Sequence, residues 1–273
     1  MTPDTSIASS RQRTRRLAHR VALLAAAALL ACAASAAAAP NPATNITPGP
    51  LPRACTNAPQ SARCIAGVMT VLDRARAVIG LGPYNVPTDF AALPGADQLL
   101  ILSNLDRIAY GLTPISGLVP ALNTVAASGV SADTDPDPSA ALSAVASFSW
   151  VSNWAGDYPN APEAYYAWMY YDGWSGRQTS NLDCTSATAS GCWGHRQDVL
   201  AFSDPGIVSM GAYVGRDAHG QVGYAMTLVW TPSSTWTNYT YTWVSAQADG
   251  AGTRGRHAAG KRRPQIVVTA RVS

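Results

Sequence analysis

The chain has 273 residues, of which 47% are hydrophobic and 13% are charged, so it is long enough for one large domain or two small ones. Its charge is spread unevenly: residues 1–39 carry five arginines and one acid, and residues 251–273 carry six basic residues and no acid. Residues 40–250 therefore hold eight basic residues against fifteen acidic ones. So acidic a segment is not typical of a nucleic-acid-binding protein, and we expect no nucleic-acid partner.

Residues 1–38 have the layout of a secretory signal peptide. Arginines precede the apolar run Val21–Ala31, and small residues up to Ala36 or Ala38 offer a cleavage site. The run is too short to cross a bilayer, so the pattern predicts an exported protein without a transmembrane span in the mature chain. Cys32, preceded by Leu-Leu-Ala, resembles the cysteine of a bacterial lipobox, so a lipid-anchored form stays open as an alternative. We therefore expect an extracellular or cell-envelope protein.

Four cysteines lie outside the signal peptide: Cys55, Cys64, Cys184 and Cys192. An even number in an exported chain predicts two disulfides. Three pairings are possible, and nearness in sequence favours Cys55–Cys64 and Cys184–Cys192. The chain has no Cys-x-x-Cys pair and no second histidine at ligand spacing, so we expect no zinc site and no cofactor.

The first half of the exported chain reads as a leader followed by helices. Residues 39–60 are rich in proline, asparagine and threonine, which predicts an exposed, flexible leader. Over 61–79 apolar residues recur every three or four positions, which predicts an amphipathic helix that ends at a Gly-Leu-Gly-Pro sequence. Similar patterns predict helices over 95–110 and 118–128.

An acidic segment and an aromatic helix follow. Residues 129–139 contain Asp133, Asp135 and Asp137, but they lack the mid-loop glycine and the distal glutamate of a calcium loop, so we interpret them as an exposed acidic turn. Pro162 is suited to the first turn of a helix rich in tyrosine and tryptophan. So dense a set of aromatic side chains predicts core packing plus one wall of a cleft.

The last third is predicted to be β-structure and a tail. Residues 206–215 and 221–230 alternate and enclose a short turn, which predicts a hairpin. Residues 236–244 alternate too and predict an edge strand within a C-terminal extension, 232–273, which ends in a basic flexible tail. Helices followed by a late antiparallel ribbon define an α+β fold class.

The stretch around the second cysteine pair is the best candidate for a functional site. A disulfide between Cys184 and Cys192 would fix the start of a short helix-like run, 197–202, and with it the direction of His195. The charge of a histidine changes near physiological pH, which suits a functional role. The alternative, in which His195 only hydrogen-bonds to the backbone beside Trp193, stays open.

Several segments together resemble a divergent bacterial member of the CAP superfamily, the cysteine-rich secretory or SCP-like proteins. The resemblance implies an α-β-α sandwich with a central antiparallel sheet and a cleft over it, here spanning residues 61–231. The segments that carry it are Leu102–Arg107 with Gly111–Ile115, Pro120–Leu122 with Ala126, Ser152–Ala155, Trp168-Met169 with Gly194–Leu200, Gly211–Val214 and Val222–Trp230.

The chain departs from this family at the residues that matter for metal binding. Many members line the cleft with two histidines and two glutamates, which can hold a divalent cation. Here the first histidine position falls near Gly129, one glutamate falls on Ser152, and the second falls on Tyr171 or Asp172. His195 alone matches clearly, so we predict no tightly bound metal.

The leading functional hypothesis is a non-catalytic secreted protein, expected to be a monomer, that binds a small ligand or a cell-envelope partner in a cleft around His195. The aromatic walls suit an apolar ligand or a glycan. The predicted cleft residues are His195, Trp193, Ser152, Asn153, Trp154, Tyr166 and Tyr170.

Two alternatives remain. The first is an extracellular hydrolase with His195 as general base, Ser152 as nucleophile and Asp172 or Asp198 as the orienting acid, although no Gly-x-Ser-x-Gly elbow surrounds the serine. The second is an envelope-anchored structural or adhesion protein, held by the basic tail or by a lipid on Cys32.

Overall fold

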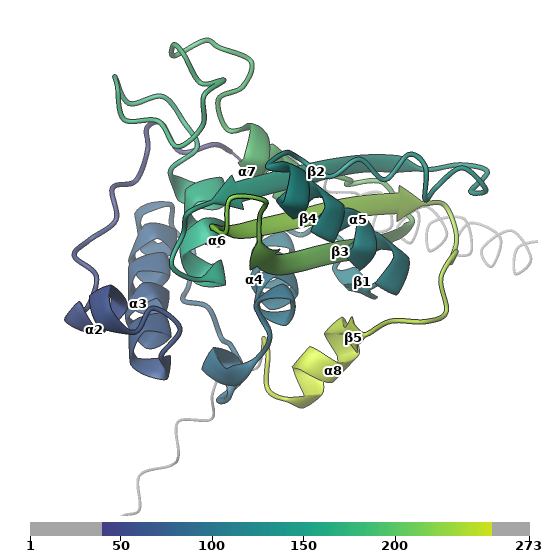
Figure 1. Ribbon diagram of the computed structural model, residues 1–273, viewed down its shortest axis with the longest axis horizontal. Coiled ribbons are helices and arrows are strands. Elements are labelled where there is room, and N and C mark those ends of the chain that lie inside the picture. Colours follow the sequence, from purple (N-terminus) through teal and green to yellow (C-terminus); the bar gives the residue numbers. More distant parts are fainter. Residues whose placement is uncertain (1–39, 253–273) are drawn as a thin grey trace, which may run out of the picture. The chain divides into compact units, whose positions relative to one another are not determined.

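The computed structural model describes residues 40–252 (Figure 1). The predicted signal peptide, Cys32 and most of the basic tail therefore lie outside the described residues. A five-stranded sheet in the order β2-β4-β3-β1-β5 forms the centre of the described part. The strands are β1 (Ile115–Leu118), β2 (Ser149–Gly156), β3 (Ile207–Arg216), β4 (Val222–Thr231) and β5 (Tyr241–Thr242).

The helices agree with the periodicity of the sequence in most places. The predicted helices over 61–79, 95–110 and 118–128 and the aromatic helix after residue 160 all form, so the α+β class is confirmed. The helices are α2 (Arg53–Asn57), α3 (Ala62–Val78), α4 (Gly95–Ala109), α5 (Pro120–Ala132), α6 (Ala161–Tyr170), α7 (Gly194–Val199) and α8 (Trp243–Ala248), with a 3-10 turn at Phe90–Ala92.

The sheet is mixed, which corrects the expectation of a wholly antiparallel one. The predicted hairpin is present as β3 and β4, and β2 pairs with β4 along its whole length, all antiparallel. Strand β1, however, pairs with β3 in parallel. It has only four residues, too few for an alternating pattern to stand out, and the sequence therefore gave no sign of it.

Helices cover both faces of the sheet. On β4, Tyr224, Met226 and Leu228 pack into the main core with α3, α4 and α6. Their neighbours Ala225 and Val229 belong to clusters that include residues of α5, which lies over β3 and β4 (Figure 1). This alternation follows from the two-residue period of a strand. Strand β2 is an open edge of the sheet, with α5 on one side of it and α6 and α7 on the other.

Most residues of the segment 40–60 are exposed, as its composition suggests, but the segment is attached to the domain at Asn45 and Ile46. The side chain of Asn45 is buried, where it accepts a hydrogen bond from the backbone N–H of Gly173 at 2.6 Å and donates to Gln178. The backbone N–H of Ile46 donates to Tyr170 at 2.8 Å. A polar residue is buried at little cost when its hydrogen bonds are made, which is why the composition did not reveal this attachment.

The described part of the C-terminal extension also packs on the domain. The predicted strand over 236–244 is reduced to β5, which pairs with β1 at the far edge of the sheet. The Thr242 side chain accepts a hydrogen bond from the N–H of Ser245 at 3.0 Å and so caps α8, which ends the strand. Trp243 and Ala246 are buried, so this helix closes one end of the core.

A fully buried polar cluster joins α3, α4 and α6. Asp106 accepts hydrogen bonds from the hydroxyls of Tyr84 at 2.5 Å and Tyr165 at 2.6 Å, and it forms an ion pair with Arg76. The hydroxyls of Tyr84 and Tyr170 lie 2.8 Å apart. Burial raises the pKa of Asp106, which the charge of Arg76 and the two hydroxyl donors oppose. We refer to these five residues as the Asp106 cluster.

Candidate functional site

The site is built on a hydrogen-bonded pair, Asp172 and His195. Asp172 follows the end of α6 and is fully buried. One of its carboxylate oxygens lies 2.7 Å from Nδ1 of His195, and the other accepts the backbone N–H of the same residue at 2.9 Å. The imidazole itself is 23% exposed. The carboxylate therefore fixes the direction of the ring and leaves its other edge available.

The disulfide loop holds this pair in place. Both expected disulfides, Cys184–Cys192 and Cys55–Cys64, are confirmed. The Asn181 side chain donates to the Asp172 carboxylate, and its oxygen accepts the N–H of Cys184 at 2.7 Å. The loop closed by the disulfide is thereby tied to Asp172.

A second tie comes from the sheet. Asn153 on β2 is fully buried, and its amide donates to the backbone carbonyl of His195 at 2.8 Å. The amide oxygen of Asn153 has no hydrogen-bond partner within residues 40–252. Helix α7 begins at Gly194, three residues before the predicted helical run, so His195 stands in the first turn of the helix.

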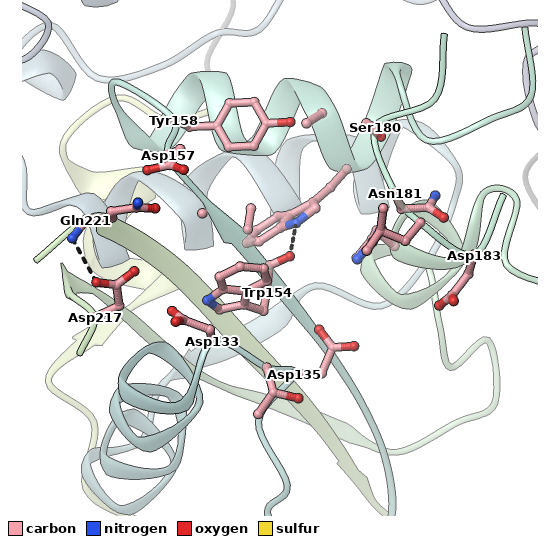
Figure 2. A pocket seen from close by; sticks show the side chains of 17 residues that line it. Asp133, Asp135, Trp154, Asp157, Tyr158, Ser180, Asn181, Asp183, Asp217 and Gln221 are labelled. Carbon is pink, nitrogen blue, oxygen red and sulfur yellow. Dashed lines mark hydrogen bonds between the residues drawn. The ribbon is translucent and has the colours of Figure 1, made fainter. Parts of the chain in front are cut away.

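A cleft of about 780 Å³ opens along β2 beside this pair. Figure 2 shows Trp154 in its centre, with Asp133, Asp157 and Asp217 on one side and Asp183 on the other. The indole ring lies against two glycines of the sheet: a Cβ would meet it at 2.9 Å from Gly156 and at 3.5 Å from Gly223. The residues lining the cleft are Asp133, Thr134, Asp135, Trp154, Ala155, Gly156, Asp157, Tyr158, Ala167, Trp168, Ser180, Asn181, Leu182, Asp183, His195, Asp217 and Gln221.

The electrostatics of the cleft are dominated by carboxylates, since five aspartates line it and no lysine or arginine does. Burial lowers the pKa of His195, but the hydrogen bond and charge of Asp172, together with the charges of Asp135 and Asp198, outweigh it and raise the pKa above 6.5. Burial raises the pKa of Asp198 to about 7. Burial also raises the pKa of Asp135, although the charge of His195 lowers it in part. The cleft therefore combines carboxylate acceptors with an imidazole whose pKa is raised.

The predicted cleft residues divide into two groups. His195 and Trp154 line the cleft, whereas Ser152, Asn153, Tyr166, Tyr170 and Trp193 do not. Nearly every side of α6 is covered by other residues, so both tyrosines are buried in the core. The Trp193 ring fills the space beside Gly173, at which a Cβ would meet it at 2.1 Å. The aromatic wall of the predicted cleft is thus reduced to Trp154, with Trp168 and Tyr158 beside it.

Of the residues in the hydrolase hypothesis, the structure brings only some close to one another. His195 and Asp172 form the expected pair, but Ser152 does not line the cleft. On β2, Ser152 alternates with Asn153, whose amide reaches α7, so the serine side chain is on the opposite face of the strand. Asp198 acts on His195 through its charge.

None of the five acidic residues that line the cleft was identified as a site residue from the sequence; Asp133 and Asp135 were assigned to an exposed acidic turn. Asp133 ends α5, Asp157 follows β2, Asp217 lies in the turn between β3 and β4, and Asp183 directly precedes the disulfide loop. Each turn alone has an ordinary polar composition. Their common location depends on the strand order, in which β2 and the β3–β4 turn meet near the end of α5, and no local signal carries that information.

A metal site needs several donor atoms close to one another. The one group of acidic, histidine or cysteine side chains within residues 40–252 whose donor atoms all lie within 4.8 Å is Cys55, Cys64 and Glu163. Its two sulfurs are bonded to each other, so they do not offer thiolates to a metal. The carboxylates of the cleft do not form such a group.

Comparison with known proteins gives little further guidance. No protein-family model matches the chain, and no curated protein matches it. Among solved structures, the chain is similar to a cysteine-rich secretory protein from Staphylococcus aureus subsp. aureus Mu50, with 16% identity and a TM-score of 0.33. The similarity covers 50% of this chain and 38% of that one, and a similarity of this size carries no argument about function. Within the described part of the chain, every helix is too short or too polar to span a membrane.

Proposed function

We propose that this chain is an exported ligand-binding domain of the CAP type, which holds a small ligand or a cell-envelope component in the cleft between Trp154 and His195. One observation carries the proposal: a histidine oriented by a buried aspartate stands at the edge of a cleft of about 780 Å³ that also exposes part of an indole ring. Clefts of roughly 300–1,000 Å³ with a few oriented polar groups are typical of small-molecule sites.

The CAP assignment within this proposal rests on segments of the sequence that meet at the site. The segment Ser152–Ala155 supplies Asn153 and Trp154, and the segment Gly194–Leu200 supplies His195. The hydrogen bond from the Asn153 amide to the His195 carbonyl joins the two. The proposal of export rests on the layout of residues 1–38 and is supported by two disulfides, which are typical of exported proteins.

The proposal is tested by mapping a fragment library onto the purified full-length chain by NMR. The library contains neutral apolar compounds, sugars, anions and cations. Ligands of the cleft are expected to shift the indole N–H signal of Trp154 and the ring signals of His195 together. The variant Trp154→Ala should lose these ligands, whereas Trp150→Ala, a change on the same strand at a tryptophan that is 36% exposed and outside the cleft, should keep them.

The proposal fails if the ligands of the library bind elsewhere and leave both reporter signals unchanged. It also fails if the two tryptophan variants weaken binding equally, because the indole of the cleft would then have no special role.

Hydrolysis with His195 as general base is the second candidate, because Asp172 supplies the orienting hydrogen bond that such a base needs. The raised pKa of His195 works against this role, since a general base must be unprotonated at the working pH. With Ser152 outside the cleft, the nucleophile would be a water molecule or another hydroxyl of the lining, such as that of Ser180. Turnover of ester, amide or glycoside substrates that is lost in His195→Ala and kept in Ser152→Ala would establish this activity. Equal turnover in His195→Ala would remove it.

A further inference from the structure

The cleft collects a large share of the acidic residues of the domain. Residues 40–250 contain fifteen acids and eight lysines or arginines; five of the acids line the cleft and none of the eight basic residues does. The one basic side chain of the lining is His195, and its ring is already hydrogen-bonded to Asp172. An anionic ligand would therefore meet no permanent positive charge in the lining.

The acids on one side of the cleft lie close to each other. Asp133 and Asp217 line the same side of the cleft (Figure 2), where burial and then the charge of Asp217 raise the pKa of Asp133. One oxygen of Asp133 is shielded from solvent and has no hydrogen-bond partner among the described residues. The other oxygen of Asp133 lies 3.6 Å from Nε2 of His219, which is on the exposed turn. Neighbouring carboxylates repel each other unless a proton or a cation lies between them, so this side of the cleft favours a ligand that brings positive charge and hydrogen-bond donors.

The remaining carboxylates are fixed in position. The side-chain amide of Gln221, with its nitrogen toward Asp157, donates to that carboxylate at 2.7 Å. The backbone N–H of Gln221 donates to Asp217 at 2.8 Å (Figure 2). Across the cleft, Asp183 directly precedes Cys184 and packs against Gly191 of the loop that the Cys184–Cys192 disulfide closes, where a Cβ on the glycine would meet the Asp183 Cβ at 2.2 Å. The acceptor groups are therefore largely pre-organised, which reduces the entropy lost when a ligand binds.

Trp154 lies between these two acidic sides (Figure 2). The face of an indole ring attracts ammonium and guanidinium groups, and it also packs against the alkyl chains that carry them. A bare metal ion is less suited to this arrangement, because the carboxylates of the cleft do not bring three donor atoms within 4.8 Å of one another.

From this arrangement we infer that the ligand of the cleft is an organic cation, an alkylammonium or guanidinium group on an apolar chain, which packs on Trp154 and is bound by Asp133 and Asp217 on one side and Asp183 on the other. This inference rests on the proposed function and names the class of ligand. A free amine and the side chain of a lysine present the same chemistry to the cleft.

The test is isothermal titration of the purified full-length chain with three straight five-carbon chains that carry an amine, a hydroxyl or a carboxylate at both ends. The three compounds have the same length and differ in charge. The diamine is expected to bind about tenfold or more tightly than the diol, and the diacid is expected not to bind. A single lysine with both termini blocked serves as a second cationic probe and distinguishes a lysine side chain from a free amine as the ligand. A site for peptide side chains should bind it as well as the diamine. A site for free polyamines should bind it more weakly.

Three variants locate the binding. Asp217→Asn and Asp183→Asn should each weaken the diamine by about three- to tenfold, because each removes one charge and keeps the shape of the side chain. Asp217→Asn keeps the oxygen that accepts the N–H groups of His219 and Gln221, so the turn should still form. Asp204→Asn is the matched control, since Asp204 is exposed and outside the cleft, and it should leave the affinity unchanged.

The inference is overturned if the diol or the diacid binds as tightly as the diamine, or if Asp204→Asn weakens the diamine as much as the two cleft variants. A diol that shifts the NMR signals of Trp154 and His195 and binds as tightly as the diamine would overturn the charge assignment and leave the ligand-binding function intact. Failure of the whole fragment library to shift those signals would remove the function itself. Binding of Ca²⁺ that the diamine does not displace would show a metal site instead.

Discussion

Two aspartates among residues 40–252 are fully buried but have different surroundings, Asp106 and Asp172. Asp106 is surrounded by donors that are themselves buried: Arg76, Tyr84 and Tyr165. Asp172 binds the imidazole of His195, which is 23% exposed and lines the cleft. The Asp106 carboxylate thus contacts only core residues, whereas the Asp172 carboxylate binds a histidine ring that lines the cleft.

This difference shows how to separate a structural polar group from a candidate functional one. Burial and strong hydrogen bonds are common to both aspartates, so neither property identifies a site. The partner decides: a carboxylate whose donors are all buried joins elements of the fold, here α3, α4 and α6, whereas a carboxylate that orients a partly exposed side chain also controls how that side chain meets a ligand.

The largest expected effect is on stability and concerns the Asp106 cluster. Asp106→Ala should lower the free energy of unfolding by about 3–5 kcal/mol, because it leaves the buried guanidinium of Arg76 without its counter-charge. Chemical denaturation measures this change. Asp97→Ala, on the same helix and only partly buried, is the control and should have a much smaller effect. A loss below about 1 kcal/mol for Asp106→Ala would contradict a structural role for the cluster.

The next effect compares the two disulfides, which close loops of nearly equal length, with sequence separations of 9 and 8 residues. Replacing both cysteines of either pair with serine should lower the free energy of unfolding by about 2–3 kcal/mol. Loss of Cys184–Cys192 alone should also shift the NMR signals of the His195 ring, because Asn181 connects that loop to Asp172. Equal shifts in both double variants would show that the loop does not hold the pair.

At the candidate site, Asp172→Asn should lower the pKa of His195. Burial lowers this pKa, and the variant removes the charge of Asp172 that opposes the effect of burial. In the unaltered chain the folded-state pKa of His195 is raised, so the pair stabilises the fold at pH values below the unfolded pKa, and this stabilisation disappears as the pH rises through the folded pKa. The variant should lose this pH dependence and about 1–3 kcal/mol of stability at low pH. NMR titration of the ring measures the pKa, and an unchanged value would show that Asp172 does not control the imidazole.

The smallest effect concerns Asp198, whose pKa burial raises to about 7. A raised pKa means that the folded state holds the proton more tightly than the unfolded state, so the stability due to this group falls as the pH rises toward about 7. Asp198→Asn should remove this decline and make the chain more stable above pH 7 by about 1 kcal/mol, after allowance for solvent screening. Thermal unfolding across pH provides the measurement, and a variant less stable than the parent above pH 7 would contradict the account.

Much of the fold could be predicted from the sequence because it depends on local patterns. Helices α3 and α4 follow from apolar residues at three- and four-residue spacing, and the β3–β4 hairpin follows from alternation around a polar turn. Strand β1 and the attachment of residues 40–60 to the domain could not be predicted in this way. The first is too short for a pattern, and the second depends on hydrogen bonds to distant residues such as those of Asn45.

The candidate site was predictable only in part, for the same reason. His195 and Trp154 were identified because they lie in segments with recognisable motifs, and Asp172 was identified as a possible orienting acid. Tyr166 was placed in the cleft because aromatic content does not reveal which side of a helix is covered. The aspartates of the turns, such as Asp217, were missed because only the strand order brings them together.

The most direct test of the central claim is the NMR fragment map of the full-length chain. It compares signals beside Asp172 with signals beside Asp106. The account predicts that bound fragments shift the signals of Trp154 and His195 and leave the Tyr84 ring of the Asp106 cluster unchanged. Fragments that bypass the cleft, or that shift Tyr84 as strongly as His195, would contradict the division of the molecule into a closed structural cluster and an open ligand site.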